Sequence, residues 1–452
     1  MNIGRKSTLF LAYAYEFDDD GESQLTRSEA WKKREIKGVA LLPHLDEYVR
    51  KGKLLRAYDA AGDLRAAFGA RDPWKLVDAS DEAVEITITE PPRIYVLDTN
   101  YAFIVIGVAP FVKKGEELTL AAMQDVAYAL VRAGISRVAA TSPQMTKWIA
   151  AHAAAAAAEP SILRRWLAAL VPGLRAEAPR GAPRTTAPAL FSVILANEPL
   201  GSDDRHRLRL VHRSDQVVEP AGVGDEPGEW KLSNREHCLF STFGVSWVVT
   251  TDDSAQSSHF LNDAPHMVRD RYVYKWLLVE HQRLCLLALA TECADMSNGI
   301  DGANFAEMRM RLLSFISAYN FRHVSNEERH DRFYKRVRDA LSIDDLLAEV
   351  SEEVVEIDNQ LSARRGELLN HVLAFLTLVL TPTGIMVGIF SSDTVPGPLR
   401  FDDFVSATSW FHLFTHPPFL IVLAAAAVGA TVYVRIFGAR VIFRQFLRGG
   451  MK

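Results

Sequence analysis

Six acidic residues that could bind divalent cations occupy one short stretch of the chain. They are Asp344, Asp345, Glu349, Glu352, Glu353 and Glu356, and no Lys or Arg lies among them. Carboxylate oxygens are the ligands that magnesium and calcium ions prefer, and repeated helices of this kind would build up negative charge that cations relieve. The stretch predicts a cation-sensing surface or, as the simpler interpretation, a solvated helix face.

A second set of residues recurs at helical spacing further along. Asn370, Thr377, Thr381, Gly384 and Gly388 follow one another at steps of 7, 4, 3 and 4, which places them on one helix face. Small residues allow close helix packing, whereas polar groups at bilayer depth can line a water-filled pore. Both interpretations stay open. In the pore interpretation, Leu373 is an apolar constriction, and Ser391, Ser392 and Asp393 form the pore entrance.

The stripe belongs to an apolar stretch, Leu368–Phe390, which contains no Asp, Glu, Lys or Arg. About 20 apolar residues suffice for a helix to cross a bilayer. A second apolar stretch follows at Phe419–Phe437. Basic residues precede the first stretch and follow the second. The segment that connects the two stretches contains one Lys or Arg residue, Arg400. The positive-inside rule then predicts a multi-pass protein of the cell (inner) membrane, in contact with lipid, with both termini in the cytoplasm.

A family resemblance rests on the end of the first stretch. The residues from Pro382 to Gly388, followed by Ile389 and Phe390, resemble the end of the first membrane helix in CorA-type magnesium channels. In that family a Gly-Met-Asn motif follows, where this chain has Ser391, Ser392 and Asp393. The resemblance implies a pentameric channel for magnesium or other cations, with bound divalent cations as its only cofactors.

The predicted fold is therefore an α/β domain followed by a stalk helix and two membrane helices. The predicted segments are an α/β domain at 1–300, a helical stalk at 301–367, membrane helices at 368–390 and 419–437, a loop at 391–418 and a basic tail at 438–452. A seam of apolar residues at steps of 3 and 4 indicates a coiled-coil-like stalk that assembles copies of the chain. The seam is Ile343, Leu346, Val350, Val354, Ile357 and Leu361.

Several strands and helices are predicted in the first 321 residues. Predicted strands are Thr8–Phe17, Val84–Thr89, Arg93–Leu97, Tyr101–Val108, Ala189–Ala196, Cys238–Phe243 and Val245–Thr251, and predicted helices are Ser28–Gly38, Pro43–Lys53, Leu120–Ala133, Tyr272–Cys293 and Ala303–Phe321. Tyr272–Cys293 is long and mostly apolar, but the charges at its centre, which include Lys275 and Glu280, would cost too much in lipid. We therefore expect a helix of the α/β domain there.

Composition excludes several classes of function. A net charge of −5 argues against a nucleic-acid partner. The sequence contains no phosphate-binding glycine loop, no Gly-x-Ser-x-Gly elbow and no paired-cysteine zinc pattern, so we do not expect an enzyme. The predicted function is a cation channel gated by its large N-terminal domain. The alternative is a membrane effector whose N-terminal domain responds to an unidentified small molecule or protein.

Overall fold

The computed structural model describes twelve ranges of the chain. They are 1–16, 21–36, 40–51, 54–68, 73–78, 83–97, 101–133, 135–140, 188–216, 228–250, 265–297 and 302–391. The chain divides into two units, Met1–Val354 and Val355–Lys452. The first unit contains the sheet and most of the helices, and helix α12 begins in the first unit and ends in the second.

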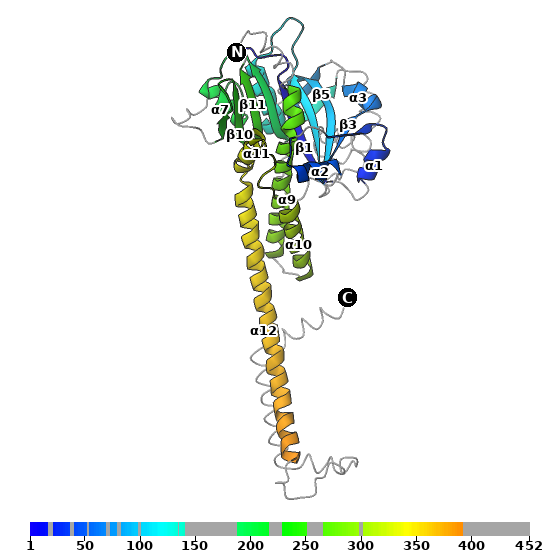
Figure 1. Ribbon diagram of the computed structural model, residues 1–452, viewed down its shortest axis with the longest axis vertical. Coiled ribbons are helices and arrows are strands. Elements are labelled where there is room, and N and C mark those ends of the chain that lie inside the picture. The colour runs from blue at the N-terminus through cyan, green and yellow to red at the C-terminus, as the bar shows by residue number, and fades with distance from the viewer. Residues whose placement is uncertain are drawn as a thin grey trace. The chain divides into compact units, whose positions relative to one another are not determined.

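The first unit is built on one mixed sheet of 11 strands (Figure 1). The strands are β1 (Thr8–Glu16), β2 (Trp31–Arg34), β3 (Leu55–Ala60), β4 (Trp74–Asp78), β5 (Ala83–Leu97), β6 (Tyr101–Pro110), β7 (Ile135–Ala140), β8 (Ala189–Ala196), β9 (Glu229–Lys231), β10 (Glu236–Ser241) and β11 (Gly244–Thr250). Their order is β2-β3-β5-β6-β1-β8-β11-β10-β9, with β4 joining β5 to β7. Neighbouring strands are antiparallel except β8 and β11, which are parallel.

Helices cover both faces of this sheet. The helices are α1 (Gly21–Arg27), α2 (Pro43–Arg50), α3 (Gly62–Phe68), α4 (Leu120–Tyr128), α7 (Ser202–Leu210), α9 (Val273–Ser297), α10 (Gly302–Ala318), α11 (Glu328–Ala340) and α12 (Ile343–Ser391), and a short π-helix (Ala129–Ala133) follows α4. Leu9 and Leu11 of β1 join the core that α1, α3, α4 and α7 cover. Phe10 joins the opposite core, which α2, α9 and α11 cover. A strand buried on both faces has no polar alternation, as in β1 and β6.

Most of the predicted strands and helices are present. β1, β6, β8 and α9 lie where the sequence predicted them, within a few residues, and the charges of α9 are accommodated inside the first unit. The helix predicted at Ser28–Gly38 is wrong. Trp31–Arg34 form β2 instead, because pairing with β3 supplies their backbone hydrogen bonds and the core buries Trp31. Tertiary pairing overrides local propensity at such positions.

The predicted two-span membrane architecture is corrected by the structure. Among the residues that it describes, no helix is long and apolar enough to cross a membrane. The predicted first span, 368–390, is the C-terminal part of α12, which continues without interruption from a strongly charged N-terminal part. Asn370, His371, Thr377 and Thr381 interrupt the apolar surface of this part. An uncharged apolar run shows only that burial of its side chains away from water is favourable. It does not show whether lipid or protein surrounds them.

The same finding overturns the predicted multi-pass membrane localisation and the orientation derived from it. The predicted second span (419–437), most of the predicted loop (391–418) and the tail (438–452) lie outside the described residues, which end at 391.

Candidate functional site

The predicted cation-sensing residues lie on the first four turns of α12, mostly facing solvent. Asp344, Asp345, Glu349, Glu352 and Glu356 are exposed, and Glu353 is half-buried. Asp344 is paired with Arg338, and Glu356 accepts a hydrogen bond from Gln360 at 3.1 Å. Across the described residues, no three His, Cys, Asp or Glu side chains are grouped closely enough to hold a metal ion. This arrangement favours the solvated-face interpretation of the acidic stretch.

The apolar seam of α12 is already covered within a single chain. Ile343, Val350 and Val354 are 1%, 0% and 6% exposed, and Leu346 packs against the core that α9 and α11 cover. Ile357 and Leu361 are also buried. From Ile343 to Val354 the seam is therefore covered within a single chain, and assembly of copies of the chain stays a prediction.

The predicted pore-lining residues lie in the C-terminal half of the same helix. Asn370, Leu373, Thr377, Thr381 and Gly384 are exposed, and Thr377 Oγ1 donates a hydrogen bond to the Leu373 carbonyl at 2.8 Å. Gly388 and Ser391 belong to α12, and Ser391 is its last residue. The other two predicted entrance residues, Ser392 and Asp393, lie outside the described residues.

A cavity of about 410 Å³ lies between the end of α9 and the start of α10. Its lining residues are Glu292, Asp295, Met296, Asn304, Glu307, Met308 and Arg311. On α9 the lining residues are spaced i, i+3 and i+4, and on α10 they are spaced i, i+3, i+4 and i+7. Each set therefore forms one face of its helix. Two facing helix faces of this kind build the pocket.

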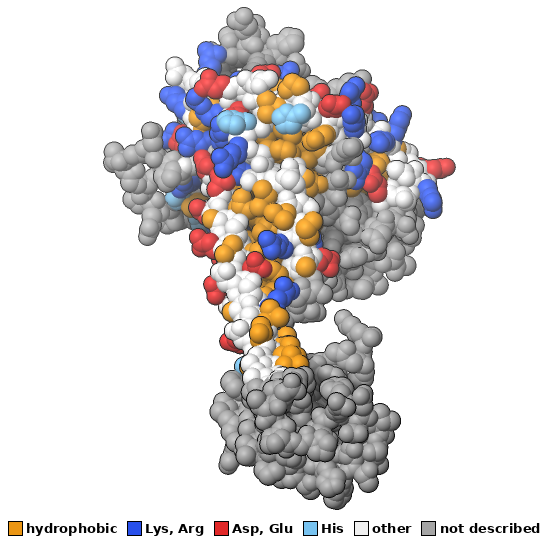
Figure 2. All heavy atoms as spheres, turned by 60° about the horizontal axis from the view of Figure 1, so that its bottom comes forward, with side chains coloured by type: hydrophobic (Ala, Val, Ile, Leu, Met, Phe, Trp, Pro, Cys, Tyr) orange, Lys and Arg blue, Asp and Glu red, His pale blue; other side chains and the backbone are white. Residues whose placement is uncertain are grey.

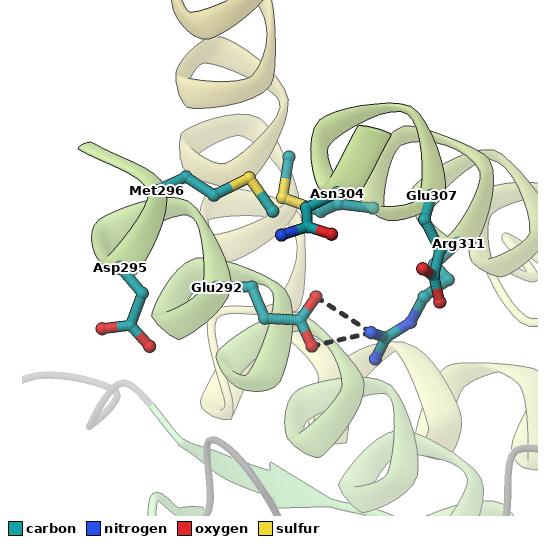
Figure 3. Close-up of a pocket in the computed structure, with 7 residues that line it drawn as sticks. Glu292, Asp295, Met296, Asn304, Glu307 and Arg311 are labelled. Atoms are coloured by element: carbon teal, nitrogen blue, oxygen red, sulfur yellow. Dashed lines mark hydrogen bonds and ion pairs between the residues drawn. The ribbon is translucent and has the colours of Figure 1, made fainter. Parts of the chain in front are cut away.

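The pocket combines three carboxylates, one guanidinium, one amide and two thioethers. The Glu292 carboxylate accepts hydrogen bonds from Arg311 at 2.7 and 3.0 Å, and in Figure 3 this ion pair closes one side of the pocket. In the same view Asn304 lies above the Glu292 carboxylate and Glu307 is on the side of Arg311, whereas the Asp295 carboxylate points away from them. Because one guanidinium faces three carboxylates, the pocket favours a positively charged ligand.

The floor of the pocket is connected to α12. Met308 is 1% exposed, and its thioether accepts a hydrogen bond from the buried Cys293 thiol at 3.5 Å. Burial, together with the neighbouring Glu353 carboxylate, raises the pKa of Cys293 to about 11. Glu353 belongs to α12, and its Oε2 atom is buried without a hydrogen-bond partner among the described residues. A movement of Met308 would therefore change the contact between Cys293 and Glu353, and through it the position of α12.

Helix α9 also carries ionisable groups deep in the fold. Lys275 and His281 are fully buried, and Glu280 is 5% exposed. Burial lowers the pKa of Lys275 to about 7 and that of His281 to about 3, and it raises the pKa of Glu280 to about 7. Lys275 Nζ donates to the Arg271 carbonyl at 2.8 Å, and Trp276 Nε1 donates to Glu280 at 3.2 Å. These groups are held by individual hydrogen bonds, and none of them lines the pocket.

None of the pocket residues was predicted from the sequence. Asp295 lies three residues after Glu292, and Glu307 lies three after Asn304, so each helix shows a polar face that could have been noticed. The apposition of the two faces depends on how α9 and α10 pack against each other, and the sequence pattern of either helix gives no information on that.

Comparisons with protein-family models, with curated protein sequences and with solved structures find no match to this chain. The resemblance to CorA-type channels is not tested by these comparisons and stays a prediction.

Proposed function

We propose that the chain is a ligand-controlled effector in which the pocket between α9 and α10 is the regulatory site and α12 is the responding element. The observation that carries this proposal is the double role of Met308, which lines the pocket and accepts a hydrogen bond from Cys293. Cys293 in turn lies beside Glu353 of α12. A ligand in the pocket would therefore act on the contacts that hold the N-terminal part of α12.

The lining favours a small organic cation. Asp295 and Glu307 supply negative charge that the Glu292–Arg311 ion pair leaves uncompensated. Thioethers such as Met296 and Met308 are polarizable and adapt to irregular apolar groups. A small ammonium compound presents both a charge and an apolar surface. Ligand pockets typically begin at about 300 Å³, so the cavity is large enough for such a compound.

The test is a titration of the purified chain with spermidine, choline and guanidinium, followed by thermal unfolding and by hydrogen exchange of residues 343–361. At about ten times Kd a bound cation should raise Tm by about 2–4 °C, and exchange in α12 should slow. Asp295→Asn and Glu307→Gln should weaken the effect, whereas Glu198→Gln, an exposed acid outside the pocket, should not. The proposal would be refuted if the cation-induced rise in Tm were reduced equally in all three variants. It would also be refuted if the cation bound without slowing hydrogen exchange in α12.

The second half of α12 supplies a surface through which the helix could act. Six apolar side chains, which cover an arc of about 140° on the helix, are between 44% and 62% exposed: Leu368, Leu369, Val372, Leu373, Leu376 and Leu380. Hydrophobic side chains along the described part of this helix are visible in Figure 2. Exposed apolar surfaces of this kind mark interaction sites, and we propose self-association through this arc.

Light scattering on the full chain tests the self-association. The double substitution of Leu369 and Leu373 by Asn should lower the mass in solution toward that of one chain. Ala363→Asn is the matched control, because Ala363 is exposed on the same helix outside the arc. An unchanged mass in the double variant would contradict assembly through this surface.

A further inference from the structure

Three sulfur-containing side chains gather at the pocket between α9 and α10. Cys293 and Met296 are three residues apart on α9, which places both on one face of that helix. Met308 comes from α10. The Cys293 Sγ and Met308 Sδ atoms are 3.5 Å apart, and both side chains are almost fully buried. Sulfur atoms from two separate helices are therefore brought together beside a cavity.

Two of these side chains border the cavity itself. Met296 and Met308 line it, and in Figure 3 the Met296 side chain extends from the end of α9 toward the centre of the pocket. Cys293 contacts Met308 from the core. The chain has only three cysteines and nine methionines in 452 residues, so composition alone does not account for this grouping. The cavity, about 410 Å³ in volume, gives a small ion access to the thioethers.

Thioether sulfur discriminates between kinds of metal ion. Methionine and cysteine sulfur atoms are soft ligands that select copper(I), whereas magnesium and calcium ions take oxygen ligands. Zinc sites in proteins use thiolate, imidazole and carboxylate ligands. A group of two thioethers and one thiol therefore favours a soft monovalent ion over these divalent ions.

The distance between the sulfur atoms suits joint binding of one ion. At a metal–sulfur bond length of about 2.3 Å, two sulfur ligands in a tetrahedral arrangement lie about 3.8 Å apart. Cys293 and Met308, at 3.5 Å, are close to that separation. A coordinating thiol is deprotonated, so the S–H bond of Cys293 breaks, a metal–sulfur bond forms and the proton leaves to solvent. Exchange of one proton for one monovalent ion leaves the net charge of this buried site unchanged.

We propose that Cys293, Met296 and Met308 bind one copper(I) ion at the floor of this pocket. The Glu353 carboxylate, which lies beside Cys293, adds negative charge that attracts the ion. The ligands are sulfur atoms. The inference therefore does not rest on the binding of an organic cation by the carboxylates, nor on a response of α12.

The test is a titration of the full chain with copper(I) under reducing conditions, in competition with a coloured copper(I) chelator. One ion should bind per chain, and a large excess of magnesium should not displace it. Met296→Leu and Met308→Leu should each weaken binding by at least about 10-fold, because even groups that only orient a metal ligand contribute about that much. Cys293→Ser should weaken binding further, since it removes the anionic ligand.

Met310→Leu is the matched control. Met310 lies on α10 two residues after Met308, is 61% exposed and does not line the cavity. Because Leu and Met are similar in volume, both variants should fold, which thermal unfolding checks. Met310→Leu should leave copper(I) affinity unchanged. Equal losses in Met308→Leu and Met310→Leu would overturn the proposal, as would an unchanged affinity in Cys293→Ser.

A further variant separates this inference from the function proposed for the pocket. Glu307→Gln should weaken the effect of organic cations on Tm, but it should leave copper(I) binding in place because the sulfur ligands remain. If the folded natural chain did not bind copper(I) at micromolar concentration, the metal site would be refuted, whatever the outcome with organic cations.

Discussion

Arg338, near the end of α11, is paired with Asp344 in the first turn of α12. The Arg338 side chain is 4% exposed and also donates to Gln282 Oε1 at 3.0 Å and to Asn320 Oδ1 at 3.1 Å. One guanidinium thus ties α9, the segment after α10 and the start of α12 together. Ser342, between α11 and α12, has a φ of 49°, so the turn itself is in the left-handed region.

Arg338→Leu should therefore lower the free energy of unfolding by about 3 kcal/mol or more, because it leaves buried acceptors without donors. Asp344→Asn should cost less than about 1 kcal/mol, since the Asp344 side chain is 74% exposed and its charge is screened. Denaturant unfolding of both variants measures the difference. Equal destabilisation would show that the buried network does not hold this junction.

Gly244→Ala should strongly destabilise the sheet. Gly244 has a φ of 143°, and a Cβ atom there would lie 1.8 Å from the Leu190 carbonyl oxygen of the parallel neighbour β8. Displacement of a central strand and the unfavourable φ together should cost about 3 kcal/mol or more. Gly201→Ala is the control, because a Cβ atom at Gly201 meets nothing within 4 Å. Thermal unfolding should separate the two variants clearly.

Glu280→Gln should change how stability depends on pH. Burial raises the pKa of Glu280 from 4.5 to about 7. Between these values the folded chain retains a proton that the unfolded chain has released, so its stability falls as pH rises from 4.5 to 7. The glutamine variant has no carboxyl group at this position, so its stability does not fall in this pH range for that reason. Its stability relative to the natural chain should therefore be greater at pH 8 than at pH 4.5, by up to about 3 kcal/mol.

Urea unfolding of both proteins at several pH values checks this expectation. Lys275 and His281 titrate in both proteins, so their contributions cancel in the difference. A difference that does not vary between pH 4.5 and 8 would mean that Glu280 is ionised normally in the folded chain.

Val350→Asp should unfold the start of α12 rather than separate assembled copies. Val350 is 0% exposed within a single chain, and burial of an unpartnered carboxylate there should cost about 4 kcal/mol or more. Val355→Asp is the control on the same helix, because Val355 is 59% exposed. Circular dichroism and unfolding measurements distinguish the two. If the Val350→Asp variant folded normally and had a lower mass in solution than the natural chain, the seam would be an assembly surface after all.

The sequence alone was sufficient to predict those strands and helices that are uniformly buried, or buried along one continuous side. β6 is buried at every described position, and β1 at nearly every one. An apolar run predicted β6, and the alternation of Tyr and Ala with larger residues predicted β1. The charges at the centre of α9 predicted a helix of the α/β domain, and only the structure shows that they are buried, where hydrogen bonds to the backbone and to neighbouring side chains offset the cost of burial. The residues of α12 up to Leu361 show a helical repeat that predicted both the helix and its buried side.

The tertiary structure decided what those elements contact. Trp31–Arg34 became a strand because β3 was available to pair with it. The seam of α12 predicted burial correctly, but burial in the chain's own core and burial against another copy require the same apolar repeat, so the sequence could not distinguish them. The pocket between α9 and α10 depends on side chains that converge from two separate helices. Convergence of that kind is fixed by the turns and by the packing of whole helices, and local residue patterns do not record it.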